Sequence, residues 1–179
     1  MLAMMTVGAS GLVIHDGTAR AWRASETYVG IALFAESLLL AVPRLGTFVG
    51  SQALTSASGF FFERDGRLHL VTSRHVLVDE PSRHFPDRVE IVVHTDEADL
   101  SRTRVFSLPL FRQGQALWRQ GRDSGGEVDV AVLPVEPAAL EGFRPRAFSP
   151  RHLQQTLGDV EIGAPLLVVG FPLGFQDGR

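Results

Sequence analysis

Cysteine and lysine are both absent from this 179-residue sequence. Without cysteine, the chain has no disulfide, no thiol nucleophile and no cysteine-ligated zinc site, although this absence does not identify a cellular compartment. Without lysine, all 17 basic residues are arginines. The net charge of −3 is small and no long block of like charges is present, so we expect no nucleic-acid partner.

A long uninterrupted apolar run is missing as well. The most apolar stretch, residues 28–42, contains Glu36 and is shorter than the roughly 20 residues that a membrane-spanning helix needs. The start of the chain also lacks the positive charge and the apolar run of a signal peptide. We therefore expect no membrane span; the compartment is undetermined, with a cytoplasmic location slightly favoured.

Long amphipathic helical segments are scarce too. Short apolar runs rich in Val, Ile and Phe alternate with clusters of Gly, Pro, Asp and Arg, a pattern typical of strands and turns. We predict strands at residues 29–34, 38–42, 59–63, 68–72, 89–94, 104–109, 128–134 and 165–171. A turn is expected within residues 137–142, and a short helix with Ser149 as its N-cap and Pro150 at its first position. Many short strands with few helices predict an all-β barrel or sandwich.

Two positions stand out as candidates for chemistry. In residues 58–76, two apolar strands joined by a predicted hairpin turn at Asp65-Gly66 lead to His75 at the end of the second strand. A histidine held by a rigid hairpin is well placed to act as a general base. The second position is Asp129, which is unusual because it introduces a carboxylate near the start of an apolar strand.

These segments resemble the trypsin-like serine peptidases, in particular the cysteine-free bacterial Deg type. The S-G-F run at residues 58–60 and the T-S-R-H-V run at residues 72–76 match the first-barrel hairpin of that family. The V-D-V-A-V-L run at residues 128–133 matches its D-[VI]-A-[VL]-L segment. Residues 161–174 resemble the glycine-containing segment that opens its second barrel, and the three matches follow the family's order along the chain.

The resemblance implies a trypsin-like double β-barrel. Residues 27–134 would form the complete first barrel, residues 135–179 a linker and the start of a partial second barrel, and residues 1–26 a leader or extension. It also implies that His75 takes the proton from a serine hydroxyl and that Asp129 orients the imidazole. The substrate would be a polypeptide, and neither a cofactor nor a metal would be needed.

The nucleophilic serine of this family lies in a G-x-S-G segment beyond the second-barrel opening, and no such segment follows residue 174. The D-S-G-G run around Ser124 precedes Asp129, whereas the family order is His, Asp, Ser, so we reject it as the nucleophile. Because loss of the serine lowers turnover by on the order of 10⁶ in a related protease, we expect the 179 residues alone to lack peptidase activity. Uncovered apolar strands around residues 166–171 are expected to promote self-association.

Three interpretations stay open. The chain is the N-terminal part of a serine endopeptidase, or a non-catalytic trypsin-like barrel that binds a protein partner, or an unrelated β-barrel whose motifs match by accident. The retained pair of His75 and Asp129 favours the first, because a binding module has no chemical use for it. In the third interpretation, these two side chains would lie far apart in space.

The remaining titratable residues show no metal-site spacing. None of the other histidines belongs to an H-E-x-x-H motif, and the carboxylates of residues 96–99 lack the ligand spacing of a calcium loop, so we expect structural or solvated roles. These histidines are His15, His69, His84, His94 and His152. The three consecutive phenylalanines at residues 60–62 are expected to pack in or beside the core. The long interval between His75 and Asp129 predicts an extra hairpin or loop within residues 97–123.

Overall fold

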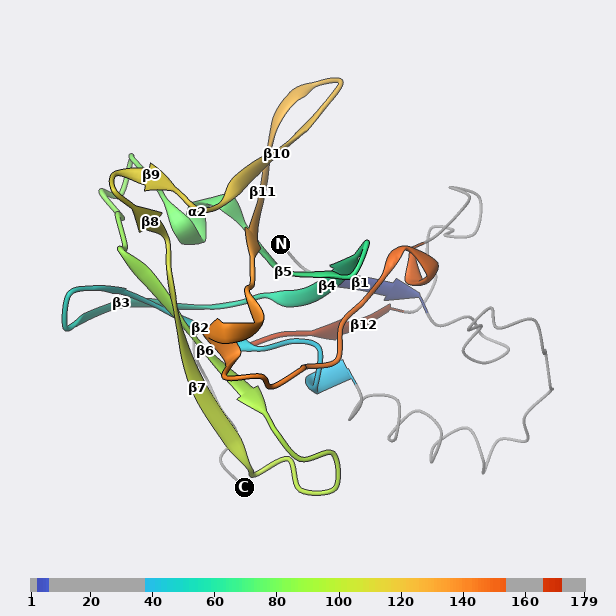
Figure 1. The fold of residues 1–179 in the computed structure, drawn as a ribbon. Helices are drawn as coiled ribbons and strands as arrows, with labels where there is room; N and C mark the ends of the chain where they lie inside the picture. Colours follow the sequence, from blue (N-terminus) through green and yellow to red (C-terminus); the bar gives the residue numbers. More distant parts are fainter. Residues whose placement is uncertain (1–2, 7–37, 154–165, 172–179) are drawn as a thin grey trace.

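The structure is a computed structural model that describes residues 3–6, 38–153 and 166–171 (Figure 1). Strands dominate it, which confirms the predicted all-β class. In chain order the elements are β1 (Ala3–Thr6), β2 (Arg44–Val49), β3 (Gln52–Ser58), β4 (Phe60–Arg64), β5 (Arg67–Thr72), α2 (Arg74–Leu77), β6 (Arg88–His94), β7 (Thr103–Pro109), β8 (Phe111–Arg112), β9 (Gln115–Ala116), β10 (Arg119–Asp123), β11 (Gly126–Pro134), η1 (Pro137–Leu140), η2 (Pro150–His152) and β12 (Leu166–Val169).

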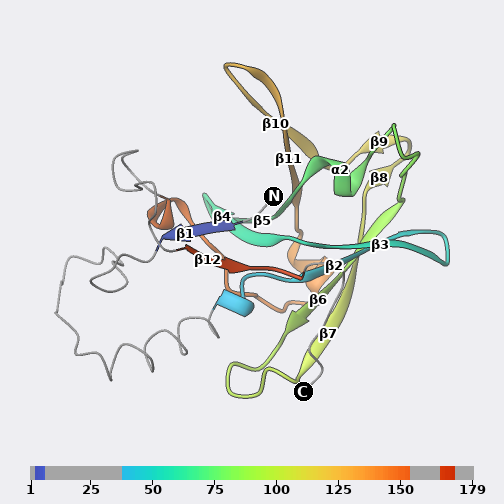
Figure 2. The same ribbon diagram turned by 180° about the vertical axis from the view of Figure 1, so that it is seen from behind.

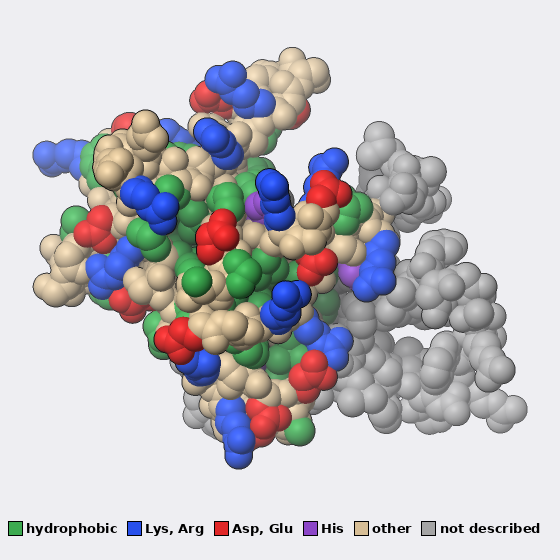
Figure 3. All heavy atoms as spheres, in the orientation of Figure 1, with side chains coloured by type: hydrophobic (Ala, Val, Ile, Leu, Met, Phe, Trp, Pro, Cys, Tyr) green, Lys and Arg blue, Asp and Glu red, His purple; other side chains and the backbone are tan. Residues whose placement is uncertain are grey.

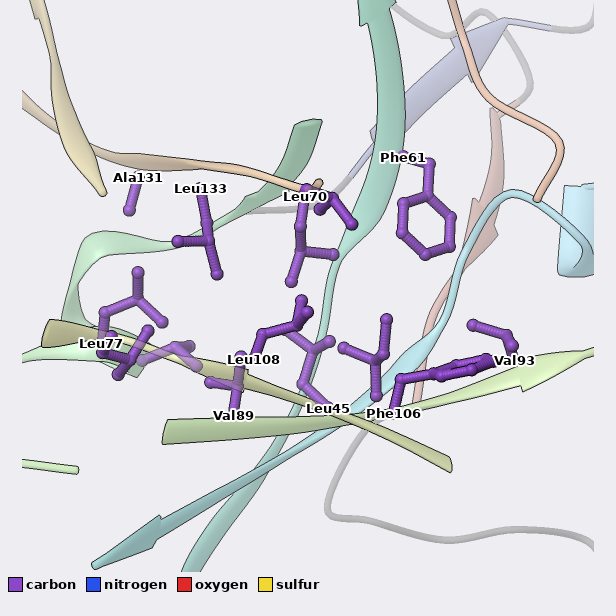
Figure 4. Packing of buried hydrophobic residues seen from close by; sticks show 14 of the residues in the cluster. Leu45, Phe61, Leu70, Leu77, Val89, Val93, Phe106, Leu108, Ala131 and Leu133 are labelled. Atoms are coloured by element: carbon purple, nitrogen blue, oxygen red, sulfur yellow. The ribbon is translucent and has the colours of Figure 1, made fainter. Parts of the chain in front are cut away.

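Two four-stranded antiparallel sheets form the body of the described chain. One sheet has the strand order β10-β11-β5-β4 and the other has the order β3-β2-β6-β7. The core lies between them: Figure 4 shows Leu70 and Leu133 of the first sheet facing Val89 and Leu108 of the second. Among the described residues, no ladder joins the two sheets into a closed barrel, so the expected complete first barrel is not shown.

Strand β6 shows why this sequence forms a two-faced sheet. Its residues alternate strictly between buried and half-buried, and Val89, Ile91 and Val93 are 0%, 0% and 2% exposed. Because side chains of a strand point alternately to opposite faces, these three all enter the core. Burying an aliphatic side chain of this size stabilises the fold by about 1.5–3 kcal/mol.

The chain passes from one sheet to the other at Gly59, between β3 and β4. A Cβ at this position would lie 3.0 Å from Leu45 Cδ1, 3.0 Å from the backbone oxygen of Val71 and 3.1 Å from Leu70 Cδ1. A larger residue would therefore require the backbone of Val71 and the core leucines to shift by a few tenths of an ångström. The S-G-F run noted in the sequence is explained locally by this close approach.

The predicted hairpin turn is present between β4 and β5. Asp65 and Gly66 both have positive φ, at 53° and 72°, as a two-residue type I′ hairpin requires. A second hairpin joins β8 to β9, with positive φ at Gln113 and Gly114. It lies within residues 97–123, where the sequence predicts extra length.

Six predicted strands are confirmed with small shifts at their ends: β4, β5, β6, β7, β11 and β12. The predicted strand at residues 38–42 is wrong, because the N–H of Ala41 donates to the oxygen of Leu38 (2.9 Å) and closes a helical turn. The apolar run reflects burial, which a helical turn satisfies as well as a strand does. The prediction at residues 29–34 and residue 165 of the last strand lie outside the described residues.

Strands β2 and β3 were missed by the sequence analysis. Polar residues and Gly46 dilute their apolar pattern, although Leu45 and Thr47 of β2 are fully buried. Strand β1 was missed too; it lies in the expected leader and pairs with β12. The end of β12 contacts β3, because the N–H of Phe171 donates to Ser58 Oγ (2.6 Å).

The predicted turn within residues 137–142 is present as the 3₁₀ turn η1, and the predicted short helix after Ser149 is present as the 3₁₀ turn η2. The predicted packing of residues 60–62 is also found: Phe61 is fully buried, and Phe60 meets Phe148 edge to face with ring centroids 5.8 Å apart. Within the described ranges, no helix has both the length and the apolar character needed to span a membrane.

Candidate active site: a histidine and aspartate pair

His75 lies on α2, a single helical turn that follows β5. The last two residues of the turn, Val76 and Leu77, are 8% and 1% exposed and belong to the core. Their burial anchors the turn, because a helix of four residues is not stable on its own. The side chain of His75 is instead 61% exposed and accessible to solvent. Both ribbon views place α2 between the β8–β9 hairpin and β11 (Figures 1 and 2).

Asp129 lies in a β-bulge of β11. The pairing of β10 with β11 shifts register between Gln120 and Arg122, so Gly121 alone faces residues 128–130. Asp129 is the middle residue of these three. Bulges bend the strand locally and change the direction of a side chain, which is why they often occur beside functional sites.

Gly121 is the residue that makes room for this bulge. A Cβ there would lie 2.9 Å from Val128 Cγ2 and 3.2 Å from the Cβ of Val130. On the other side of the strand, β11 begins to pair with β5 only at Ala131, opposite Thr72. Asp129 therefore has no ladder partner on β10 or on β5, in a strand that contacts α2.

The carboxylate of Asp129 accepts two hydrogen bonds from one residue. The backbone N–H of His75 donates to Oδ1 (3.0 Å), and Nδ1 of the imidazole lies 2.7 Å from Oδ2. Because an ionised carboxylate only accepts hydrogen bonds, Nδ1 carries the proton and donates it. The structure therefore brings the two predicted residues within hydrogen-bonding distance of each other.

The pKa of Asp129 is lowered by this arrangement. Partial burial acts to raise the pKa, but the hydrogen bonds from the backbone and the ring of His75 and the charge of His75 together outweigh it. The carboxylate therefore stays ionised at neutral pH, as an acceptor for the imidazole must.

The pair can act as a base and its orienting partner. With Nδ1 donating to Asp129, Nε2 of His75 keeps a lone pair that can take a proton, and the carboxylate stabilises the imidazolium that forms. The side chains of the pair are 61% and 54% exposed, so a reacting group has access to them.

Ser124, the rejected nucleophile, lies in the turn of the β10–β11 hairpin. This hairpin projects from the rest of the molecule in both ribbon views (Figures 1 and 2). At about 3.3 Å per residue, an extended strand would span about 10 Å from Gly126 to Asp129, and Ser124 lies beyond Gly126 in the turn. Its position agrees with the sequence argument against it.

Three of the histidines for which structural or solvated roles are expected form hydrogen bonds with the backbone. Nε2 of His84 lies 2.9 Å from the oxygen of Val76, and Nδ1 of His94 lies 2.6 Å from the oxygen of Leu100. Nδ1 of His152 accepts the N–H of Ser149 (2.9 Å). His69 lies on β5, opposite Phe62 of β4 and Pro134 of β11. His15 lies outside the described residues.

The carboxylates of residues 96–99 lie in the connection between β6 and β7. Asp96 accepts the N–H of Ala98 (2.9 Å), and Glu97 forms a bidentate pair with Arg146. No group of three potential metal ligands occurs in the part of the chain that the structure describes. Over the face seen in Figure 3, basic and acidic side chains are interspersed.

Three residues around the pair were missed by the sequence analysis: Gly121, Arg74 and Glu80. Gly121 had a usable signal, because a glycine within a strand often marks a bulge or a close backbone approach. Arg74 and Glu80 form an ion pair across the end of α2, and no sequence signal indicated it. Comparison of the chain with family models, with curated proteins and with solved structures finds no match.

Proposed function

We propose that this chain is the histidine- and aspartate-bearing part of a trypsin-like serine endopeptidase, a hydrolase that cleaves polypeptides through an acyl-enzyme. The observation that supports the proposal is the double hydrogen bond from His75 to Asp129. It joins the only two residues that the family resemblance marks as catalytic. In this proposal the two facing sheets correspond to the first barrel of the trypsin-like double barrel.

His75 acts first as a base and then as an acid. Its Nε2 takes the hydroxyl proton of a serine as the serine oxygen attacks the scissile carbonyl carbon, and it returns that proton to the leaving amine. Water then repeats the cycle and releases the acyl group from the serine. Asp129 stays ionised throughout and holds the imidazole in the tautomer with Nδ1 protonated. No G-x-S-G segment follows Asp129 in the sequence, so the proposal assigns the nucleophile to none of these 179 residues.

The test uses the protein as its own cell produces it. Its intact mass is compared with 19.5 kDa, and its hydrolysis of a fluorogenic peptide library is measured with and without a serine-directed phosphonate. We expect phosphonate-sensitive hydrolysis. Asp129→Asn should lower kcat about 10⁴-fold, as the same change does in a serine protease triad, and His75→Ala should abolish activity.

Matched controls come from exposed residues of the same types outside the pair. His152→Ala and Asp123→Asn should leave hydrolysis unchanged. The proposal is overturned if phosphonate-sensitive hydrolysis survives His75→Ala, or if the native protein hydrolyses no peptide. In the second case, the non-catalytic binding module becomes the better interpretation.

A further inference from the structure

A second contact network lies at the end of α2, beside the histidine and aspartate pair. Nη1 of Arg74 donates to the backbone oxygen of Val78 (3.1 Å) and to Oε2 of Glu80 (2.9 Å), while Nη2 donates to Oε1 of Glu80 (2.7 Å). The backbone N–H of Val78 donates in turn to the oxygen of Arg74 (3.0 Å). Arg74 and Val78 are therefore joined through both the backbone and a side chain, across the turn that contains His75.

The geometry of one peptide unit connects this network to the site. The carbonyl of Arg74 and the N–H of His75 belong to the same peptide plane, which is rigid. At one edge of this plane the carbonyl accepts the N–H of Val78, and at the other edge the N–H donates to Asp129. A rotation of the plane that breaks one hydrogen bond consequently misdirects the other.

We propose that Arg74 and Glu80 are positioning residues, which hold α2 in the conformation that presents the backbone N–H and the ring of His75 to Asp129. This inference rests on the proposed function of that pair. Glu80 fixes the guanidinium by a bidentate contact, and the guanidinium keeps Val78 folded back over the turn. A lysine could not replace Arg74, because a single ammonium lacks the planar fork that makes these contacts together.

The charges around the guanidinium favour the same arrangement. The hydrogen bond from Arg74 lowers the pKa of Glu80, and the bond to Glu80 raises the pKa of Arg74, so the pair stays ionised at neutral pH. Asp79 and Glu127 add further attraction on Arg74. Glu80 is exposed and Arg74 is half-buried, and ion pairs that solvent reaches contribute little to global stability, so the effect of this pair should be concentrated on His75.

The test is made by NMR on the 179-residue chain, with two observables at His75: the hydrogen-exchange rate of its backbone amide and the ring tautomer, read from the nitrogen chemical shifts. Glu80→Gln and Arg74→Lys should raise the exchange rate about tenfold or more, the factor implied by losing one hydrogen bond to a charged group. The share of the tautomer protonated at Nδ1 should fall.

The matched control is the pair of Arg146 and Glu97, which is also bidentate, with contacts of 2.8 and 2.7 Å. Both of its side chains are exposed, whereas in the pair at α2 Glu80 is exposed and Arg74 is half-buried. Glu97→Gln should change neither observable at His75. All variants should melt within about 4 °C of the unchanged protein, as expected for exposed ion pairs. If Glu80→Gln leaves both observables as Glu97→Gln does, the positioning role is wrong.

Asp129→Asn separates this inference from the function on which it rests. It should change both observables more than Glu80→Gln does, because it alters the acceptor itself. If Asp129→Asn changes them and Glu80→Gln does not, only the positioning role fails. If Asp129→Asn leaves them unchanged, the pair is not formed in solution, and the proposed function fails with the inference.

Discussion

The two four-stranded sheets differ in regularity. In the sheet β3-β2-β6-β7, all seven residues of β6 pair with β7 without a break, and their burial alternates strictly. In the sheet β10-β11-β5-β4, the ladder is interrupted by the bulge around Asp129, and β5 leads directly into the helical turn of α2. The more regular sheet supplies six of the fifteen buried residues of the core cluster, whereas the irregular one carries the candidate site. The more regular sheet also has one register shift, between Thr47 and Phe48 in the pairing of β2 with β3, so the two sheets differ in degree. The bulge around Asp129 is the departure from ideal pairing that coincides with the candidate site.

The largest expected effect comes from weakening the regular sheet. Ile91 on β6 is fully buried, so Ile91→Ala should lower the free energy of unfolding by about 2–5 kcal/mol, since the change removes buried methyl groups and leaves a cavity. Urea denaturation measures the loss. Val105→Ala on the neighbouring β7, where Val105 is 60% exposed, should change stability by no more than about 0.5 kcal/mol. Equal losses of unfolding free energy in Ile91→Ala and Val105→Ala would contradict the burial of one face of β6.

An intermediate effect is expected from the irregular sheet. Gly121→Ala should cost about 1–3 kcal/mol, because its Cβ would press on Val128 and Val130 and overpack the bulge. It should also shift the amide signals of α2, since Asp129 lies between those two valines. Gly125→Ala is the matched change in the same hairpin; its Cβ would approach only Asp123 Oδ1, at 3.2 Å, which can move.

The Gly121 comparison is read from thermal unfolding together with amide chemical shifts. Unchanged α2 signals in Gly121→Ala, alongside a clear loss of stability, would mean that the bulge does not direct Asp129 toward His75. If the amide signals of α2 move equally in Gly125→Ala, Gly121 has no particular role in directing Asp129 toward His75.

The smallest expected effect concerns pH. The pKa of Asp129 is lowered in the folded chain, so its contribution to stability is present above the ordinary aspartate pKa and is lost as pH falls through the folded value. Because the side chain is about half exposed, that contribution should be well below about 1 kcal/mol. His75→Ala should move the pKa of Asp129 upward, since the ring hydrogen bond and the ring charge disappear while the backbone N–H remains.

Carbon NMR of the Asp129 carboxyl during an acid titration measures this shift. His152→Ala, distant in sequence and capping η2, is the control and should leave the titration of Asp129 unchanged. A titration of Asp129 that is the same with and without the His75 ring would contradict the hydrogen bond between the two side chains.

Much of the strand pattern was predictable because it depends on local chemistry. Strands β6 and β7 follow from runs of β-branched and apolar residues, and the β4–β5 turn follows from the preference of Asp-Gly for positive φ. The failures have a common cause. Residues 38–42 are apolar because they are buried, which does not determine their backbone conformation, and β2 is a strand despite Gly46 because β3 and β6 pair with it on both sides.

The sequence by itself determined the all-β class, the hairpin turn and the choice of His75 and Asp129 as the residues to examine, since each depends on residue type and short-range spacing. Only the tertiary structure decided that the two meet and how. Their contact requires a bulge opposite Gly121, a ladder with β5 that starts only at Ala131, and a helical turn closed by Arg74 and Glu80. Each of these depends on pairing between segments distant in the chain, which residue preferences do not encode.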